Sequence, residues 1–149
     1  MANHTSNIGT HAELVAMTAL LAAGYEVADP VAAEVYDLVA KEPMTGAWQT
    51  FQVKTLRFRA DKGGDGGGYY VLNGTRNSGE VYGPDDIDYM IGVLDDACYL
   101  VECTGQTEYW ASAGAIDGKW RKLTVGMRGV TSVNAVQYAS PTKTMMEAV

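Results

Sequence analysis

Twelve residues, from Trp48 to Arg59 (WQTFQVKTLRFR), alternate in the manner of a β-strand. Neighbouring side chains of a strand point to opposite faces, so Phe51 and Val53 are predicted to face the core together. Gln52 and Lys54 then point together to the other face. The pattern therefore requires a β-sheet that carries a polar pair on one strand.

A helix is predicted over residues 10–23, which are rich in alanine, leucine and methionine. Thr10 and Glu13 have the spacing of a capping box, and Gly24 follows the run as a helix-ending glycine. Apolar residues lie on nearly every side of this helix. We therefore expect it to be packed on most of its circumference.

Shorter strands are expected before and after this pair of elements. They cover residues 25–27, 35–40, 69–73, 87–94 and 98–101, with weaker elements at 110–115 and 121–125. The glycine-rich residues 63–68 (GGDGGG) are expected to form a hairpin loop. A chain of 149 residues with this pattern is predicted to be one α/β domain. Its central mixed β-sheet would have about four or five strands and be flanked by helices.

Composition excludes several classes of protein. No segment has the length of apolar sequence that a membrane span needs, and the first residues lack the pattern of a signal peptide. Cys98 and Cys103 form neither a CxxC pair nor a disulfide framework, so a structural zinc site is not expected. Sparse cysteine use favours a cytoplasmic location.

The charge is unevenly distributed along the chain. The formal net charge is −7, which argues against a protein that coats nucleic acid. Residues 41–76, however, carry six basic residues against three acidic ones. A basic segment of this size can contact a few phosphates.

Asp37 stands alone among apolar neighbours in the segment 35–40. A buried carboxylate must be paired or bound to a cation. Asp37 and Gln52 offer oxygen ligands for Mg²⁺, and Lys54 offers a positive charge for water or a phosphate, as phosphodiester hydrolysis requires. Each residue also has a simpler explanation: Gln52 and Lys54 as a solvated strand face, and Glu13 as a helix cap.

Several short motifs follow one another in a specific order. They are Asn7-x-Gly9 with Glu13, Gly24-Tyr25-x-Val27, Pro30, Tyr36-Asp37-Leu38, Gln52-Val53-Lys54-Thr55, Asp88-Tyr89 and Tyr99-Leu100. In these motifs, residues 7–101 resemble the PD-(D/E)XK endonucleases. The likeness is greatest to the branch with archaeal-type Holliday-junction resolvases and group I intron-encoded homing endonucleases. The expected fold is then a restriction-endonuclease-like core.

The resemblance implies an endonuclease that hydrolyses DNA with Mg²⁺, for which Mn²⁺ would substitute. It implies that Asp37 and Gln52 ligate the metal, that Glu13 completes the metal site, and that Lys54 is the motif lysine. Gln52 departs from the usual acidic residue, and the proline expected before Asp37 is absent. One alternative is a catalytically weak or silent nuclease-fold protein that binds DNA or a protein partner. Another is a structural protein in which Asp37 and Lys54 form an internal salt bridge.

Candidates for DNA contact lie both before and after the proposed metal-site residues in the sequence. Arg57, Arg59 and Lys62 continue beyond the Lys54 strand and are expected to contact backbone phosphates. Asn7 and His11, near the start of the first helix, are further DNA-binding candidates. A second basic group, an alternative DNA surface, consists of Lys119, Arg121, Lys122 and Arg128.

The chain is expected to form an oligomer, because cutting both strands of duplex DNA needs two active sites. Related enzymes act as dimers or higher oligomers, which implies a homodimer or homotetramer. The core is predicted at about residues 7–103, with 104–149 as a variable extension. Its aromatic residues, among them Tyr109, Trp110 and Trp120, are typical of an interface between protomers, although strands extending the same core explain them equally well.

Overall fold

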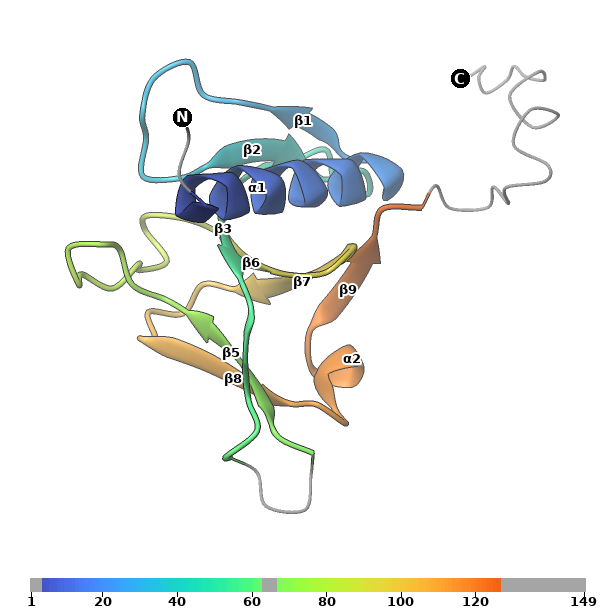
Figure 1. Cartoon of the computed structure of the whole chain (residues 1–149). Helices are drawn as coiled ribbons and strands as arrows, with labels where there is room; N and C mark the ends of the chain where they lie inside the picture. Colours follow the sequence, from blue (N-terminus) through green and yellow to red (C-terminus); the bar gives the residue numbers. More distant parts are fainter. Residues whose placement is uncertain (1–3, 63–66, 127–149) are drawn as a thin grey trace, which may run out of the picture.

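The computed structural model describes residues 4–62 and 67–126. One long helix, α1 (His4–Ala22), lies along one face of a β-sheet, and a smaller group of strands lies on the other side (Figure 1). No helix in the described ranges is long and apolar enough to cross a membrane. The strands are β1 (Glu26–Ala28), β2 (Leu38–Lys41), β3 (Trp48–Thr55), β4 (Arg57–Arg59), β5 (Tyr69–Asn73), β6 (Tyr89–Leu94), β7 (Ala97–Glu102), β8 (Glu108–Ser112) and β9 (Arg121–Thr124), and the short helix α2 (Ile116–Lys119) precedes β9.

The central sheet has six strands in the order β1-β2-β3-β6-β7-β9. The pair β3 and β6 is parallel, with Lys54 opposite Gly92, and the other pairs are antiparallel. The predicted α/β fold with a mixed central sheet is therefore confirmed. The sheet is larger than expected because β1 and β9 extend its two edges.

The strand predicted from Trp48 to Arg59 is interrupted at Leu56. The Leu56 amide donates to the Val93 carbonyl (2.9 Å), and the Leu56 side chain is buried. After this residue the chain leaves the central sheet, and β4 pairs with β5 instead. The prediction of one continuous strand is wrong, because a buried leucine at its ninth position directs the chain into a second sheet.

The second sheet has three antiparallel strands in the order β4-β5-β8. The predicted hairpin between residues 59 and 69 is confirmed by the pairing of β4 with β5, although residues 63–66 lie outside the described residues. This sheet lies below the central sheet in Figure 1. It was not predicted, since strand pairing between distant segments leaves no local pattern.

Two hydrophobic clusters hold the three layers together. The first lies between α1 and the central sheet and includes Leu20, Leu38 and Phe51. The second lies between the two sheets and includes Leu72 and Met90. The face of β3 that carries Phe51 and Val53 is buried as predicted, but the opposite face is also partly covered.

Helix α1 begins at His4, six residues before its predicted start. Thr10 and Glu13 therefore lie inside the helix, and the capping-box prediction is wrong. The prediction that α1 is packed on most of its circumference is also wrong, because Leu14 is 56% exposed and Leu21 55% exposed. Small residues form the buried side: Ala12, Ala16, Ala19 and Ala22, with Leu20. The predicted end is confirmed, since Gly24 has a φ of 95° and the Tyr25 amide donates to the Leu20 carbonyl.

Residues 104–126 belong to the same packed structure. Strand β8 pairs with β5, and β9 pairs with β7. Tyr109 and Trp120 are buried in the second cluster. The interpretation of these two aromatic residues as interface residues is therefore wrong. Residues 127–149, which include Arg128, lie outside the described residues.

Candidate active site

Asp37 lies immediately before β2, not within a strand as predicted. Its amide donates to the Phe51 carbonyl (2.8 Å), and its Oδ2 accepts a hydrogen bond from the Val53 amide (2.9 Å). Both bonds join Asp37 to β3, and they enclose Gln52. The carboxylate is thus held beside the strand that carries Gln52 and Lys54.

Asp37 and Glu13 line the same hollow, which has a volume of about 440 Å³. We call it the carboxylate hollow. Glu13 comes from α1, and the rest of the wall comes from the segment between β1 and β2. The residues that line it are Glu13, Asp29, Pro30, Val31, Ala32, Ala33, Glu34, Tyr36 and Asp37.

Both carboxylates have raised pKa values. Burial raises the pKa of Asp37, and hydrogen bonding from Val53 and the charge of Lys54 offset part of this effect. Burial also raises the pKa of Glu13, and the negative charges of Asp37 and Asp29 raise it further. In the described part of the chain, neither Glu13 nor Asp37 forms an ion pair. A cation in the hollow would relieve the unfavourable charge of both groups.

Gln52 and Lys54 lie on the same side of β3 and are both partly buried. Lys54 Nζ donates to the carbonyl oxygen of Thr75 (3.1 Å). Burial lowers the pKa of Lys54, and the nearby charge of Asp37 opposes this shift. The predicted salt-bridge alternative is wrong, because Lys54 binds a backbone carbonyl and forms no ion pair with Asp37.

The loop between β5 and β6 supplies residues that the sequence did not assign to the site. Thr75 accepts the Lys54 bond, and the Tyr82 ring lies 5.8 Å from Lys54 Nζ. Asp37 contributes to the raised pKa of Tyr82, after burial. This loop and the segment between β1 and β2 lie on the same side of the molecule (Figure 1). No spacing in the sequence connects residues 75 and 82 with Lys54.

Asn7 and His11 line a different hollow, of about 380 Å³, together with Thr55, Val93 and Asp95. On α1 they lie on the other flank of the buried face from Glu13, because His11 and Glu13 are two residues apart in the helix. The structure therefore does not place these two DNA-binding candidates in the carboxylate hollow.

The arginines on β4 are already paired. Arg57 Nη2 lies 3.0 Å from Glu108 Oε2, and Arg59 forms two hydrogen bonds with Asp61 (2.9 and 2.8 Å). Arg59 also lies over the Trp110 ring, 6.0 Å from its centroid. Lys62 is exposed. These three candidates lie on or just after β4, at the second sheet and outside the hollow.

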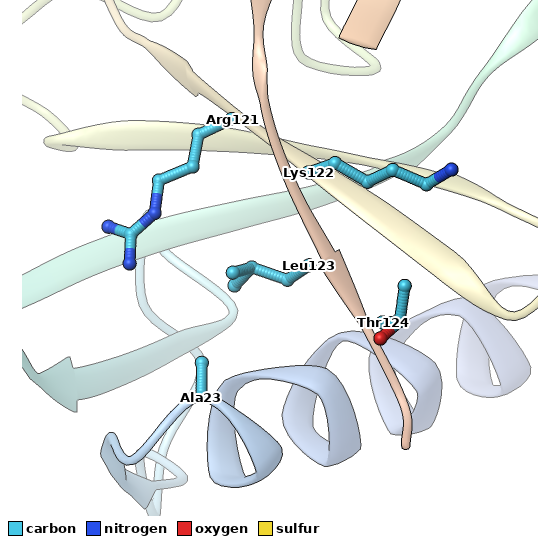
Figure 2. A pocket seen from close by; sticks show the side chains of 5 residues that line it. All are labelled: Ala23, Arg121, Lys122, Leu123 and Thr124. Carbon is cyan, nitrogen blue, oxygen red and sulfur yellow. The ribbon is translucent and has the colours of Figure 1, made fainter. Parts of the chain in front are cut away.

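The described members of the alternative basic group lie on and before β9, and two of them, Arg121 and Lys122, line a hollow of about 500 Å³. Figure 2 shows that Arg121 and Lys122 point to opposite sides of this strand. Arg121 donates to the Tyr25 hydroxyl (3.1 Å), and Lys122 lies 3.8 Å from an Asp117 carboxylate oxygen. Two cations that point apart do not form a single phosphate site.

The donor atoms of the carboxylate hollow suit a hard divalent cation. Glu13 and Asp37 offer carboxylate oxygens, and the Gln52 amide lies close enough to Asp37 to lower its pKa by hydrogen bonding. Within residues 4–62 and 67–126, no group of three or more His, Cys, Asp or Glu side chains is arranged to hold a metal ion. Two carboxylates with water and substrate phosphate are a usual set for Mg²⁺.

Comparisons with known proteins identify the family and a structure of similar fold. A search of curated protein sequences finds no significant match. A solved structure of a bacterial homing endonuclease, I-Ssp6803I, is similar in fold, with a TM-score of 0.54 and 21% sequence identity over 75% of this chain and 77% of that one. The family model of the PD-(D/E)XK endonucleases matches residues 3–115. This match covers most of the chain, and the protein therefore belongs to the PD-(D/E)XK endonuclease family.

Proposed function

We propose that this protein is an endonuclease that hydrolyses DNA phosphodiester bonds with Mg²⁺, with Mn²⁺ as a substitute. The observation that carries the proposal is the convergence of four side chains from three separate segments. Glu13 comes from α1, Asp37 from the residue before β2, and Gln52 and Lys54 from β3. Membership of a nuclease family supports the same reaction.

Glu13, Asp37 and Gln52 would hold the metal ion through oxygen atoms. When bound, the metal would polarise the phosphodiester and favour ionisation of a water molecule. Asp37 is the best positioned of the three, because its hydrogen bond from the Val53 amide fixes one carboxylate oxygen. The raised pKa values of Asp37 and Glu13 mean that both carboxylates bind protons more readily when no cation is present.

Lys54 acts on the substrate side of the site in this proposal. An ammonium group has three N–H donors, and the Thr75 carbonyl accepts one of them. The others can donate to the attacking water or to a phosphate oxygen as negative charge develops on it. A positioned donor of this kind stabilises the transition state more than the ground state.

The second sheet supplies a surface for the DNA backbone. In the β4-β5-β8 register, Arg57 lies opposite Val71, which lies opposite Trp110, and Arg59 lies opposite Tyr69. We call this side, with Arg57, Arg59, Tyr69 and Trp110, the outer face of the second sheet. Arginine next to aromatic rings suits phosphate and base contact, and antiparallel sheets can enter a DNA groove. Lys62 extends the same positive region.

A homodimer or homotetramer is part of the proposal. One domain with one carboxylate hollow would cut one strand at a time, and duplex cleavage needs two such sites. Static light scattering at micromolar concentration is expected to give a multiple of 16.0 kDa. A strictly monomeric protein, with and without DNA, would instead favour a single-strand nicking activity.

Cleavage of labelled linear, nicked and four-way DNA tests the reaction and the substrate shape together. Wild-type protein is expected to cut at least one of these with Mg²⁺ or Mn²⁺ and none in EDTA. In parallel, metal binding is titrated and measured by calorimetry. Asp37→Ala is expected to remove metal binding, whereas Glu34→Gln, which changes another carboxylate of the same hollow, is expected to retain it.

Metal binding without cleavage of any of the three DNA forms would contradict the proposed reaction. It would favour the alternative of a silent nuclease-fold protein, in which Gln52 replaces the usual acidic ligand. Equal loss of metal binding in Asp37→Ala and Glu34→Gln would show that the ligand set is wrong while leaving the reaction intact.

A further inference from the structure

Arg76 lies in the loop between β5 and β6, next to the residue that binds Lys54. The backbone around it is closely held. The Gly74 amide donates to the Thr107 carbonyl (2.8 Å), and the Arg76 amide donates to the Glu80 carbonyl (2.7 Å). A Cβ atom at position 74 would lie 2.1 Å from the Gln106 carbonyl oxygen, so only glycine fits there. The backbone next to Arg76 is therefore held against the segment between β7 and β8.

Arg76 and Lys54 share one aromatic ring. The Arg76 guanidinium carbon lies 5.1 Å from the centroid of the Tyr82 ring, and Lys54 Nζ lies 5.8 Å from the same centroid. The Thr75 carbonyl holds Lys54, and Arg76 is the next residue along the chain. Two cations are thus gathered at Tyr82, beside the proposed cleavage site.

The hydrogen-bonding capacity of Arg76 is only partly used. Its Nη2 lies 3.2 Å from Asp86 Oδ2, and the same oxygen accepts a hydrogen bond from the Gly83 amide (2.9 Å). The Nε atom is buried, and no group in the described part of the chain accepts a hydrogen bond from it. Buried donors without a partner are rare in native proteins, and they mark positions where a ligand or water completes the bonding. A guanidinium with free donors matches the oxygens of a phosphate.

We propose that Arg76 binds a backbone phosphate of DNA beside the bond that is cut. Asp86 holds the guanidinium in the free protein and competes with the phosphate for it. Lys54 and Arg76, which both lie over the Tyr82 ring, then contact the DNA together. The inference rests on the proposed function for its substrate, but the phosphate site itself depends only on the contacts of Arg76.

Fluorescence anisotropy of a labelled duplex in EDTA measures this contact without cleavage. Arg76→Gln is expected to flatten the slope of log K against log salt concentration by about one unit, the contribution of one phosphate contact. Arg76→Lys retains the charge and is expected to restore the slope. Asp86→Asn removes the competing carboxylate and is expected to tighten binding.

A double-mutant cycle separates this role from a general charge effect. If Asp86 acts through Arg76, the tighter binding of Asp86→Asn disappears in the Arg76→Gln background. Lys41→Gln is the matched control, because Lys41 also forms one ion pair (3.1 Å, with Glu26) and has a similar exposure, 39% against 34% for Arg76. It is expected to leave the slope unchanged. Melting temperatures identify variants that are not folded. If Arg76→Gln does not fold, the single variants Arg76→Lys and Asp86→Asn still test the site.

The outcomes distinguish this inference from the proposed function. An Arg76→Gln protein that is folded and has the wild-type slope would overturn the inference. So would an Asp86→Asn effect of equal size in both backgrounds. If the wild type binds duplex DNA with the expected Arg76 dependence but cuts no DNA with metal, the proposed catalysis fails and the phosphate site stands. If the wild type cuts DNA while Arg76→Gln keeps its slope, only the inference fails.

Discussion

The carboxylate hollow and the outer face of the second sheet both carry charged side chains, but the two regions differ in how these charges are paired. In the hollow, Glu13 and Asp37 have raised pKa values and, within the described residues, no ion-pair partner. On the outer face, Arg57 pairs with Glu108 and Arg59 with Asp61. The Arg59 pairing lowers the pKa of Asp61 to about 2.

This difference indicates what each region requires. The hollow has an excess of negative charge, which a bound cation would neutralise. The outer face is already neutralised, so in the proposed DNA-binding role its arginines would exchange a carboxylate for a phosphate. Exposed ion pairs contribute little to stability, and the exchange therefore costs little free energy. We expect changes in the hollow to affect the reaction strongly and changes on the outer face to affect binding moderately.

Lys54→Ala is expected to have the largest effect, a loss of about 100- to 1,000-fold in single-turnover cleavage rate. The reason is that Lys54 supplies a positioned donor beside the proposed metal site. Lys41→Ala, at a partly buried lysine at the end of β2 that does not line the carboxylate hollow, is the control and is expected to retain the wild-type rate. A wild-type rate in Lys54→Ala would exclude Lys54 from the reaction.

Gln52→Glu adds negative charge beside Asp37, at the edge of the proposed metal site. A third carboxylate is expected to strengthen Mg²⁺ or Mn²⁺ binding by about tenfold, since hard cations favour charged oxygen ligands. The metal affinity is measured by calorimetry, and cleavage is measured separately. Weaker metal binding than in the wild type would mean that repulsion from Asp37 displaces the added carboxylate.

Substitution of both Arg57 and Arg59 by glutamine tests the outer face. The salt slope of DNA binding is expected to flatten by about one to two units, because each phosphate contact contributes about 0.9. Metal binding is expected to stay at the wild-type value, since neither arginine lines the hollow. An unchanged slope would place the DNA surface elsewhere, with Lys119, Arg121 and Lys122 as the next candidates.

The smallest expected effect is the change in stability caused by Asp37→Asn. The melting temperature is expected to rise by about 2–4 °C at neutral pH without metal. Asparagine can still accept the Val53 hydrogen bond but carries no buried charge. Because folding raises the pKa of Asp37, the free energy of unfolding of the wild type falls as the pH rises through that pKa. The difference between the two proteins should therefore shrink as the pH is lowered. A difference that is constant with pH would contradict this cause.

Features that depend on local periodicity could be predicted from the amino-acid sequence. Gln52 and Lys54 share one side of β3, with Phe51 and Val53 on the other, because side chains alternate in any strand. The end of α1 at Gly24 follows from the freedom of glycine to adopt a positive φ. The hairpin between β4 and β5 follows from the glycine-rich segment. The order of the short motifs was sufficient to identify the family.

Contacts between residues far apart in the chain depend on the three-dimensional fold and could not be predicted from the sequence. Leu56 is buried between the sheets, which divides the expected strand and creates the second sheet. The parallel pairing of β3 with β6 requires a long connection, and that connection brings Thr75, Arg76 and Tyr82 to Lys54. The partners of Arg57 and Asp37 are likewise set by the pairing of strands far apart in the chain. Periodicity reports the face on which a side chain lies, but the contacts across that face depend on the packing of the whole domain.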